Sequence, residues 1–214
     1  MGGCCNPRGC DRMFGERFAR HVAGRYRKRG LDGPSRRMVD WLVSQGVEGA
    51  AVLEIGGGVG EIQLELLRRG AARTTNVELS PGYEAAAAAL AAETGLADRV
   101  ERRLGDLAVD PSVAEPADFV VLHRVVCCYP DVEALVGAAA EHARRAVVLT
   151  HPPRNLVSRA GQAVINLGMR LAGREYRSFV HPPEVMVQVL QGRGLTATHL
   201  PGGRIWQVLS ATRT

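Results

Sequence analysis

Residues 51–60 constrain the fold of this chain more than any other stretch. An apolar run predicts a short buried strand, and three glycines follow it at alternate positions (Gly56, Gly58 and Gly60). Glycine permits a tight turn and lets the backbone approach a ligand closely. The next segment, residues 61–69, carries apolar side chains at helical spacing and ends at a glycine. A strand, a glycine loop and a helix in this order predict the nucleotide-binding corner of a doubly wound sheet.

The spacing of these glycines argues against a dinucleotide as the ligand. The G-x-G-x-x-G fingerprint that starts at Gly56 would require glycine at Glu61. Glu54 also stands two residues before the first glycine, where a carboxylate would repel a pyrophosphate. The same carboxylate suits a ligand that carries a positive charge or an ammonium group. Taken alone, the motif is also compatible with a glycine-rich turn in another kind of α/β protein.

Acidic residues follow the next two predicted strands as well. Residues 75–78 form the second predicted strand, which ends at Glu78, about 20 residues beyond the glycines, where a ribose diol is held in nucleotide-binding folds. Residues 100–104 form the third, which runs into Asp106. Further strands are predicted over 118–122, 146–150, 195–198 and 205–211. Helical segments alternate with the strands, so we expect an α/β fold: a Rossmann-like, doubly wound, mostly parallel seven-stranded sheet with helices on both faces.

The pattern Glu54-x-Gly56-x-Gly58-x-Gly60, with acids after the second and third strands, resembles the class I methyltransferases. That resemblance implies S-adenosylmethionine (SAM) as the cofactor. In that family the acid after the third strand bonds the adenine amino group, and the next backbone amide meets the ring. The resemblance implies the following cofactor-binding residues: Glu54, Gly56, Gly58, Gly60, Glu78, Leu79, Asp106, Leu107 and His123.

Two further segments narrow the resemblance to one branch of the class. Residues 150–156 and residues 126–130 look like the magnesium-protoporphyrin O-methyltransferase branch, whose members methylate a propionate carboxylate. Related small-molecule enzymes have an aspartate and then a histidine after the fourth strand. Arg124 and Cys128 stand at these positions here. Both departures concern the substrate side and leave the cofactor side unchanged.

Composition and charge limit the other classes of function. With 214 residues the chain can form one α/β domain with a small addition. It lacks an apolar signal core and any run approaching the roughly 18 apolar residues of a membrane span, so we expect a cytoplasmic protein without an integral membrane segment. The net charge is +5, with arginines concentrated between residues 7 and 37. The segment after the fourth strand lacks the Asn/Asp-Pro-Pro-aromatic turn of nucleic-acid methyltransferases, which argues against nucleic acid and for a small-molecule substrate.

We expect residues 1–40 to form a basic arm with cap helices and residues 41–214 to form the SAM-binding domain. Residues 154–183 form an insertion before the sixth strand, with an apolar stripe that suits either packing on the sheet edge or a lid over the substrate. The expected acceptor pocket is bounded by Tyr26, Cys128, Tyr129, His151 and this insertion, with Arg124, Arg154 and Arg174 at its rim. The candidate positioning groups for catalysis are Tyr26, Cys128 and Tyr129.

The resulting hypothesis is methyl transfer from SAM to an oxygen, a carboxylate or phenol, of an apolar or aromatic small molecule. Five cysteines motivate an alternative, thiol-dependent methylation of a metalloid such as arsenite: Cys4, Cys5, Cys10, Cys127 and Cys128. Their spacing does not match a zinc site, so no metal is predicted. A second alternative is a SAM-binding protein without transferase activity, because Arg124 and Cys128 replace the usual aspartate and histidine.

Overall fold

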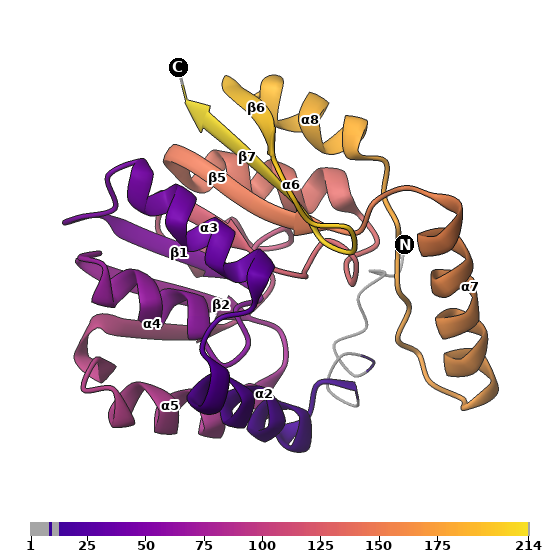
Figure 1. The fold of residues 1–214 in the computed structure, drawn as a ribbon, viewed down its shortest axis with the longest axis horizontal. Coiled ribbons are helices and arrows are strands. Elements are labelled where there is room, and N and C mark those ends of the chain that lie inside the picture. The colour runs from indigo at the N-terminus through magenta and orange to yellow at the C-terminus, as the bar shows by residue number, and fades with distance from the viewer. Residues whose placement is uncertain (1–8, 10–12, 214) are drawn as a thin grey trace.

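The computed structural model describes residue 9 and residues 13–213 (Figure 1). Its helices are α2 (Glu16–Arg29), α3 (Gly33–Ser44), α4 (Glu61–Arg68), α5 (Glu84–Glu93), α6 (Val132–His142), α7 (Leu156–Leu171) and α8 (Pro183–Gln191). Its strands are β1 (Ala51–Ile55), β2 (Arg73–Glu78), β3 (Val100–Leu104), β4 (Ala117–Leu122), β5 (Ala143–His151), β6 (Leu195–Leu200) and β7 (Gln207–Arg213). From β1 to β5 the strands alternate with helices, as the sequence pattern predicts, except between β3 and β4, which are connected by a loop with a short 3-10 turn at Pro111–Val113.

The strands form one seven-stranded sheet in the order β3-β2-β1-β4-β5-β7-β6. The first five are parallel, and β7 is antiparallel to both β5 and β6. β1 and β4 are neighbours at the centre of the sheet, and the chain continues from β1 toward one edge and from β4 toward the other, so the strand order reverses between them. Ligands bind beyond the carboxyl ends of the strands at such a switch point. The predicted Rossmann-like fold is confirmed.

Alternate residues of the central strands face opposite sides of the sheet, and each side is covered by helices (Figure 1). On one side, Val52 and Val121 pack with apolar residues of α3 and α4. On the other side, Leu53 and Val120 pack with apolar residues of α6 and α8. Because both faces are covered, the central strands are mostly apolar, and their polar ligand-binding groups, such as Glu54 in β1, lie close to the carboxyl ends of the strands.

The arm helix α2 lies outside these two layers. Its Ala19 and Ala23 pack against Leu90 and Ala91 of α5, which places α2 beside the carboxyl ends of β1 and β2. The predicted boundary between residues 40 and 41 falls inside α3, whose Met38 and Leu42 belong to the same core as the sheet. Among the described residues of the arm, α2 packs in an apolar cluster of its own with α5 and α4, apart from the two clusters that flank the sheet.

Helix α7 projects from one end of the molecule (Figure 1). It occupies the first part of the predicted insertion, and none of its residues is buried. Among the residues that the structure describes, no helix is long and apolar enough to cross a membrane.

Candidate functional site

A cavity of about 470 Å³ lies at the carboxyl ends of β1, β2 and β4. Its wall includes the glycine loop after β1, the segments that follow β2, β3 and β4, one side of α2, and Trp206. Its volume is within the range of about 300–1,000 Å³ that is usual for small-molecule sites. The cavity therefore lies where the topology of the sheet predicts a ligand.

The glycine loop adopts a backbone that side chains disfavour. Gly56, Gly58 and Gly60 all have positive φ, at 63°, 56° and 82°. Gly57 has no such φ but is equally constrained, because a Cβ there would lie 2.4 Å from Asn76 Nδ2 and 2.5 Å from Glu54 Cδ. The sequence motif identifies the three alternate glycines and misses Gly57, whose requirement comes from a contact between β1 and β2.

Glu54 is buried beneath this loop. Its Oε2, and both polar side-chain atoms of Asn76 beside it, are buried without a hydrogen-bond partner in the part of the chain that the structure describes. Burial raises the pKa of Glu54 well above its usual range, and the charge of Glu61 raises it further. Buried polar atoms are normally satisfied. Of these two residues only Glu54 lines the cavity, so its carboxyl is the group suited to a hydrogen bond with a ligand or with water there.

Glu78, at the end of β2, fixes the loop from the other side. Its Oε2 accepts a hydrogen bond from the amide of Gly58 at 3.0 Å, and its Oε1 accepts from the amides of Leu79 at 2.8 Å and Ser80 at 3.0 Å. Burial raises the pKa of this carboxyl, whereas the three amide donors act in the opposite direction. Oε1 therefore already has two donors, whereas Oε2 has one and keeps acceptor capacity for a ligand hydroxyl.

Asp106 is held by Tyr129, one of the residues expected to position the acceptor. The Tyr129 hydroxyl donates to Asp106 Oδ2 at 3.0 Å, and the amide of Ala108 donates to Oδ1 at 3.0 Å. Tyr129 lines the cavity, but only 7% of the residue is exposed. This geometry suits a residue that orients Asp106 on the cofactor side.

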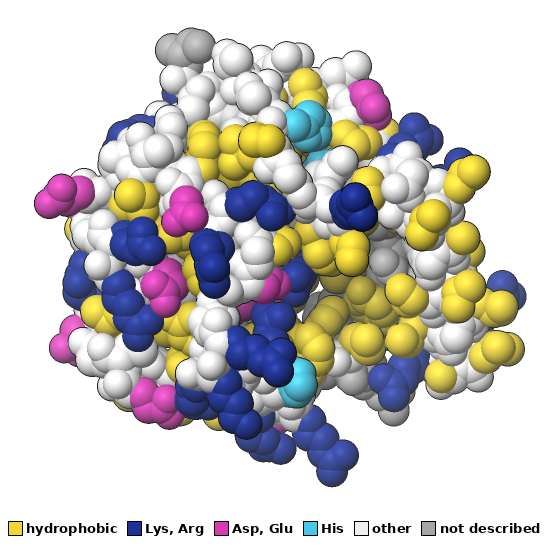
Figure 2. Space-filling model, in the orientation of Figure 1, with side chains coloured by type: hydrophobic (Ala, Val, Ile, Leu, Met, Phe, Trp, Pro, Cys, Tyr) yellow, Lys and Arg dark blue, Asp and Glu magenta, His cyan; other side chains and the backbone are white. Residues whose placement is uncertain are grey.

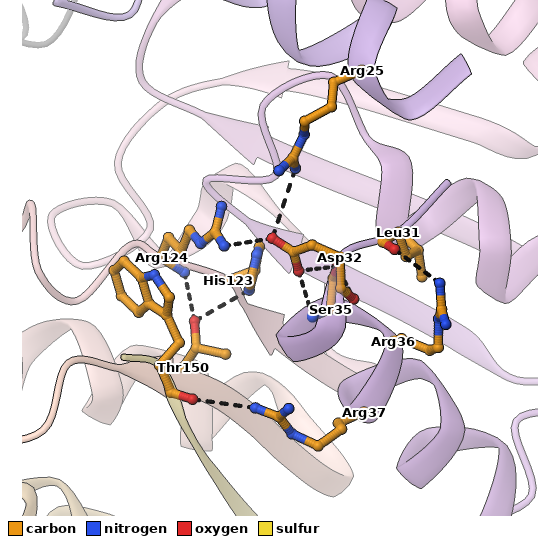
Figure 3. Close-up of polar contacts among 10 residues, drawn as sticks. Arg25, Leu31, Asp32, Ser35, Arg36, Arg37, His123, Arg124 and Thr150 are labelled. Atoms are coloured by element: carbon orange, nitrogen blue, oxygen red, sulfur yellow. Dashed lines mark hydrogen bonds and ion pairs between the residues drawn. The ribbon is translucent and has the colours of Figure 1, made fainter. Parts of the chain in front are cut away.

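An ionic cluster connects the start of α3 to the end of β4 (Figure 3). Arg124 Nη2 lies 2.5 Å from Asp32 Oδ2, and Arg25 Nη2 lies 3.7 Å from the same oxygen. Although burial raises the pKa of Asp32, its hydrogen bonds with Ser35 and the charge of Arg124 together lower it to about 2. Arg25 and Arg124 both line the cavity, so two guanidinium groups face it with one carboxylate between them.

Arg124 is the only residue other than glycine with positive φ in the described part of the chain, at 60°. Such a backbone costs about 1–3 kcal/mol and is found where the surroundings enforce it. Its amide donates to Thr150 Oγ1 at 2.8 Å, and its guanidinium lies 5.2 Å from the Trp206 ring centroid. Its Nε is buried without a partner among described residues. The strained backbone thus presents a partly unpaired guanidinium to the cavity.

His123 precedes Arg124 and also lines the cavity. Burial, followed by the positive charge of Arg124, lowers the pKa of His123 to about 3. Its Nδ1 lies 3.2 Å from Thr150 Oγ1. The imidazole is therefore neutral at physiological pH and is a weak base.

This shift predicts a loss of stability in mild acid. The unfolded chain protonates His123 near its ordinary pKa of 6.5, but the folded chain takes up that proton only near 3. The contribution of His123 to stability is therefore lost as the pH falls between these values, by about 2 kcal/mol from about pH 7 to about pH 5. The raised pKa values of Glu54 and Glu78 act in the opposite direction, so the test is the difference between two proteins. In urea unfolding, the wild type should lose about 2 kcal/mol more than His123→Gln over this pH range. Equal losses in both proteins would contradict the assignment; Asp32 titrates too low to contribute here.

Cys127 and Cys128 follow on the same loop and line the cavity. Their sulfur atoms are 3.6 Å apart, and Cys128 Sγ lies 3.1 Å from the Tyr176 hydroxyl. The hydrogen bond between the thiols raises the pKa of Cys127 and lowers that of Cys128. Cys4, Cys5 and Cys10 lie outside the described residues. No group of three or more potential metal ligands occurs among the residues that the structure does describe.

The structure brings most of the sequence-predicted site residues to the cavity wall: Glu54, Gly56, Gly58, Glu78, Leu79, Asp106, Leu107, His123, Arg124, Cys128 and Tyr129. Gly60 does not line the cavity itself, but it follows the wall residue Val59 and is the N-cap residue of α4. Tyr26 is not part of the wall, because its hydroxyl donates to Glu65 at 2.6 Å and accepts from Arg68 at 2.7 Å. His151, Arg154, Arg174 and the apolar stripe of α7 are also not among the described residues that line it.

Several wall residues have no signal in the sequence motifs. Phe14, Phe18, Tyr83 and Tyr176 form a cluster of ring contacts, with centroids 5.5–6.5 Å apart. They come from the arm, from the turn after β2 and from the segment after α7, so only the tertiary structure brings them together. Their rings make the cavity wall mostly apolar.

Comparison with known proteins identifies the central part of this fold. Residues 52–146 match the family described as a methyltransferase domain. The chain carries a methyltransferase domain. The matched range begins in β1 and ends in β5, and it contains the glycine loop, Glu78, Asp106 and the loop after β4. With the fold, this match confirms the prediction of a class I methyltransferase, the class that uses SAM.

Solved structures share this fold over nearly the whole chain. Magnesium protoporphyrin IX methyltransferase from Synechocystis PCC 6803, solved with bound SAH, is 19% identical, with a TM-score of 0.71, over 95% of this chain and 99% of that one. An O-methyltransferase family protein from Burkholderia thailandensis is 22% identical, with a TM-score of 0.71, over 92% of this chain and 60% of that one.

An O-methyltransferase family 2 protein from Planctomyces limnophilus, in complex with apigenin, is 21% identical, with a TM-score of 0.68, over 93% of this chain and 62% of that one. No curated protein sequence matches the chain. These identities show a shared fold and leave the methyl acceptor to be inferred from the site itself.

Proposed function

We propose that this methyltransferase transfers a methyl group from SAM to an oxygen of an apolar or aromatic small molecule that carries a carboxylate or a phenol. The observation that carries the proposal is Arg124, whose strained backbone holds a half-buried, partly unpaired guanidinium against an apolar cavity. An acidic acceptor would pair with this group while its apolar body contacts the surrounding rings.

The residues of the glycine loop fit SAM on the cofactor side. The Gly57 contact leaves no room for a side chain, and the unpaired atoms of Glu54 and Asn76 lie directly beneath it. We assign Glu78 to the ribose hydroxyls, and Asp106, oriented by Tyr129, to the adenine amino group. Leu79 and Leu107 line the same part of the wall.

When bound, SAM supplies an electrophilic methyl group on a sulfonium, whose departure leaves a neutral thioether. The protein then needs mainly to align the acceptor oxygen with the methyl carbon and to exclude water. His123, with a pKa of about 3, is a poor general base, which favours an acceptor that arrives ionised. A phenol would transfer its proton to the thiolate of Cys128, which becomes a thiol; the hydrogen bond with Cys127 lowers the pKa of Cys128 and so favours the thiolate beforehand.

One screen tests this assignment. SAH formation is measured with the purified chain and SAM against aromatic acids, phenols, tetrapyrrole acids, thiols and small amines. We expect turnover with the apolar acids or phenols. Turnover confined to small hydrophilic amines or peptides would contradict the proposal, and SAM binding without any turnover would favour a binding protein.

Substitution of Glu78 tests the cofactor assignment. Glu78→Ala should weaken SAM binding by about 1–3 kcal/mol, because ribose hydroxyls lose a charged acceptor and Gly58 loses its anchor. Glu101→Ala, which removes an exposed carboxylate from the neighbouring strand, is the matched control and should bind SAM as the wild type does. Calorimetry measures both variants. Binding of NAD in place of SAM would refute the cofactor assignment.

A second function, methylation of a trivalent metalloid, is favoured by one specific observation: two thiols 3.6 Å apart face the cavity. Thiolate sulfur would supply the affinity for such an ion. Arsenite titration of the wild type and of Cys128→Ser decides between the functions. Tight arsenite binding that Cys128→Ser abolishes would support the metalloid, whereas a protein indifferent to arsenite excludes it.

A further inference from the structure

Helix α7 is attached to the rest of the protein through its polar side. Gln162 Nε2 donates to the Ser178 carbonyl oxygen at 2.7 Å, and Asn166 Nδ2 donates to the same oxygen at 2.9 Å. The amide of Ser178 in turn donates to Asn166 Oδ1 at 2.8 Å. The amides on one side of α7 thus bind the extended segment that returns from the helix toward α8.

The apolar side of α7 consequently faces outward. Leu156, Val164, Leu167 and Leu171 are 81%, 71%, 58% and 80% exposed, and they recur at helical spacing on one face. Figure 2 shows hydrophobic side chains gathered over this helix. A surface helix of a globular protein normally buries such a face against the core. In α7 the polar side faces the protein and the apolar side faces outward. A contiguous exposed apolar patch of this kind marks an interaction site.

The charged residues between 152 and 174 are all arginines. Arg154, Arg159, Arg170 and Arg174 are exposed, and none of them forms an ion pair with a described residue. Residues 152–174 contain no aspartate or glutamate. The helix therefore combines an outward apolar face with arginines near both ends, and the nearest acid in the sequence is Glu175, after Arg174.

We propose that α7 binds the surface of an anionic lipid bilayer, lying parallel to the surface with its apolar face among the acyl chains. Amphipathic helices with arginines beside the apolar face bind membranes in this way, and each arginine near the surface contributes to the attraction. A second copy of the chain is a poorer occupant, because antiparallel packing of two α7 helices would bring Arg159 against the partner's Arg170. The proposal does not depend on the identity of the methyl acceptor.

Vesicle co-sedimentation with the full chain tests this proposal. We expect binding to phosphatidylcholine vesicles that contain phosphatidylglycerol, and much weaker binding to phosphatidylcholine alone. Leu156→Ser/Leu167→Ser should weaken binding roughly tenfold or more, because the apolar contribution is lost. Arg159→Gln/Arg170→Gln should weaken it on the order of tenfold, since two charges near the surface are removed. All four positions are exposed, so the variants should retain the fold, which circular dichroism checks.

Matched controls separate α7 from the general basic character of the chain. Leu104→Ser/Val109→Ser changes two exposed apolar residues near β3, the opposite edge of the sheet, and should bind vesicles as the wild type does. Arg69→Gln/Arg73→Gln removes the same charge elsewhere on the surface. Failure to bind anionic vesicles overturns the proposal. Binding that the α7 apolar variant leaves unchanged, or a dimer in sedimentation velocity that this variant dissociates, overturns it as well.

Discussion

Replacing Gly57 with alanine should abolish measurable SAM binding and lower the free energy of unfolding by about 1–3 kcal/mol. The added Cβ would lie 2.4 Å from Asn76 Nδ2 and within 2.6 Å of two carbon atoms of Glu54. Neither neighbour can yield, because both are almost fully buried at the centre of the sheet. The loop must therefore move away from β1, and the amide of Gly58 moves away from Glu78 with it.

The matched control is Gly161→Ala in α7. A Cβ at Gly161 has no neighbour within 4 Å, and alanine is the better helix former, so this variant should bind SAM normally and be at least as stable as the wild type. Calorimetry and urea unfolding measure both variants. Unchanged SAM binding by Gly57→Ala would show that the cofactor does not depend on the loop conformation described above.

The contrast between Gly57 and its neighbours shows how far the sequence alone predicts this site. Gly56, Gly58 and Gly60 belong to a local pattern of strand, turn and helix, and their requirement for positive φ follows from the turn itself. Gly57 is required because of a contact with Asn76 on another strand. Local patterns are visible in a sequence, whereas a packing requirement between distant residues is not.

The same distinction separates the acids from the residues around them. Glu78 and Asp106 were predictable because each stands at or just beyond the end of a predicted strand, and parallel strands bring their carboxyl ends to one edge of the sheet. The role of Tyr129 depends on the direction of its side chain, which turns toward Asp106. Tyr26 lies on the expected helix, but its hydroxyl faces Glu65 instead of the cavity.

The insertion at residues 154–183 shows what an apolar stripe in a sequence does and does not predict. The stripe predicts a helix, and α7 forms over Leu156–Leu171. It predicts a contact for the apolar face as well, yet the amides of Gln162 and Asn166 bind Ser178 and turn that face outward. Periodicity identifies which side chains share a face and leaves open what that face contacts.

Loss of the Arg124 guanidinium should have a large effect on turnover. Because the backbone of Arg124 has positive φ, glycine can replace it without adding backbone strain. In Arg124→Gly, glycine accepts the positive φ of 60° without cost while the cationic group is removed. We expect kcat/KM for an apolar acid to fall by a factor that corresponds to a loss of about 2–4 kcal/mol of transition-state stabilisation, because the acceptor carboxylate loses its charged partner. Arg124→Lys should recover part of this loss, since it keeps the charge and loses the planar fork.

The control variants are Arg154→Gln and Arg174→Gln, which remove the other two arginines that the sequence places near the site. Neither lines the cavity, so each should turn over the same acid at the rate of the wild type. Steady-state kinetics with an acid and with a neutral phenol of similar size completes the comparison. The phenol should lose much less in Arg124→Gly, because it brings no carboxylate to pair. An equal loss for both acceptors would mean that Arg124 shapes the loop after β4, through its bond to Thr150, and does not select the acceptor.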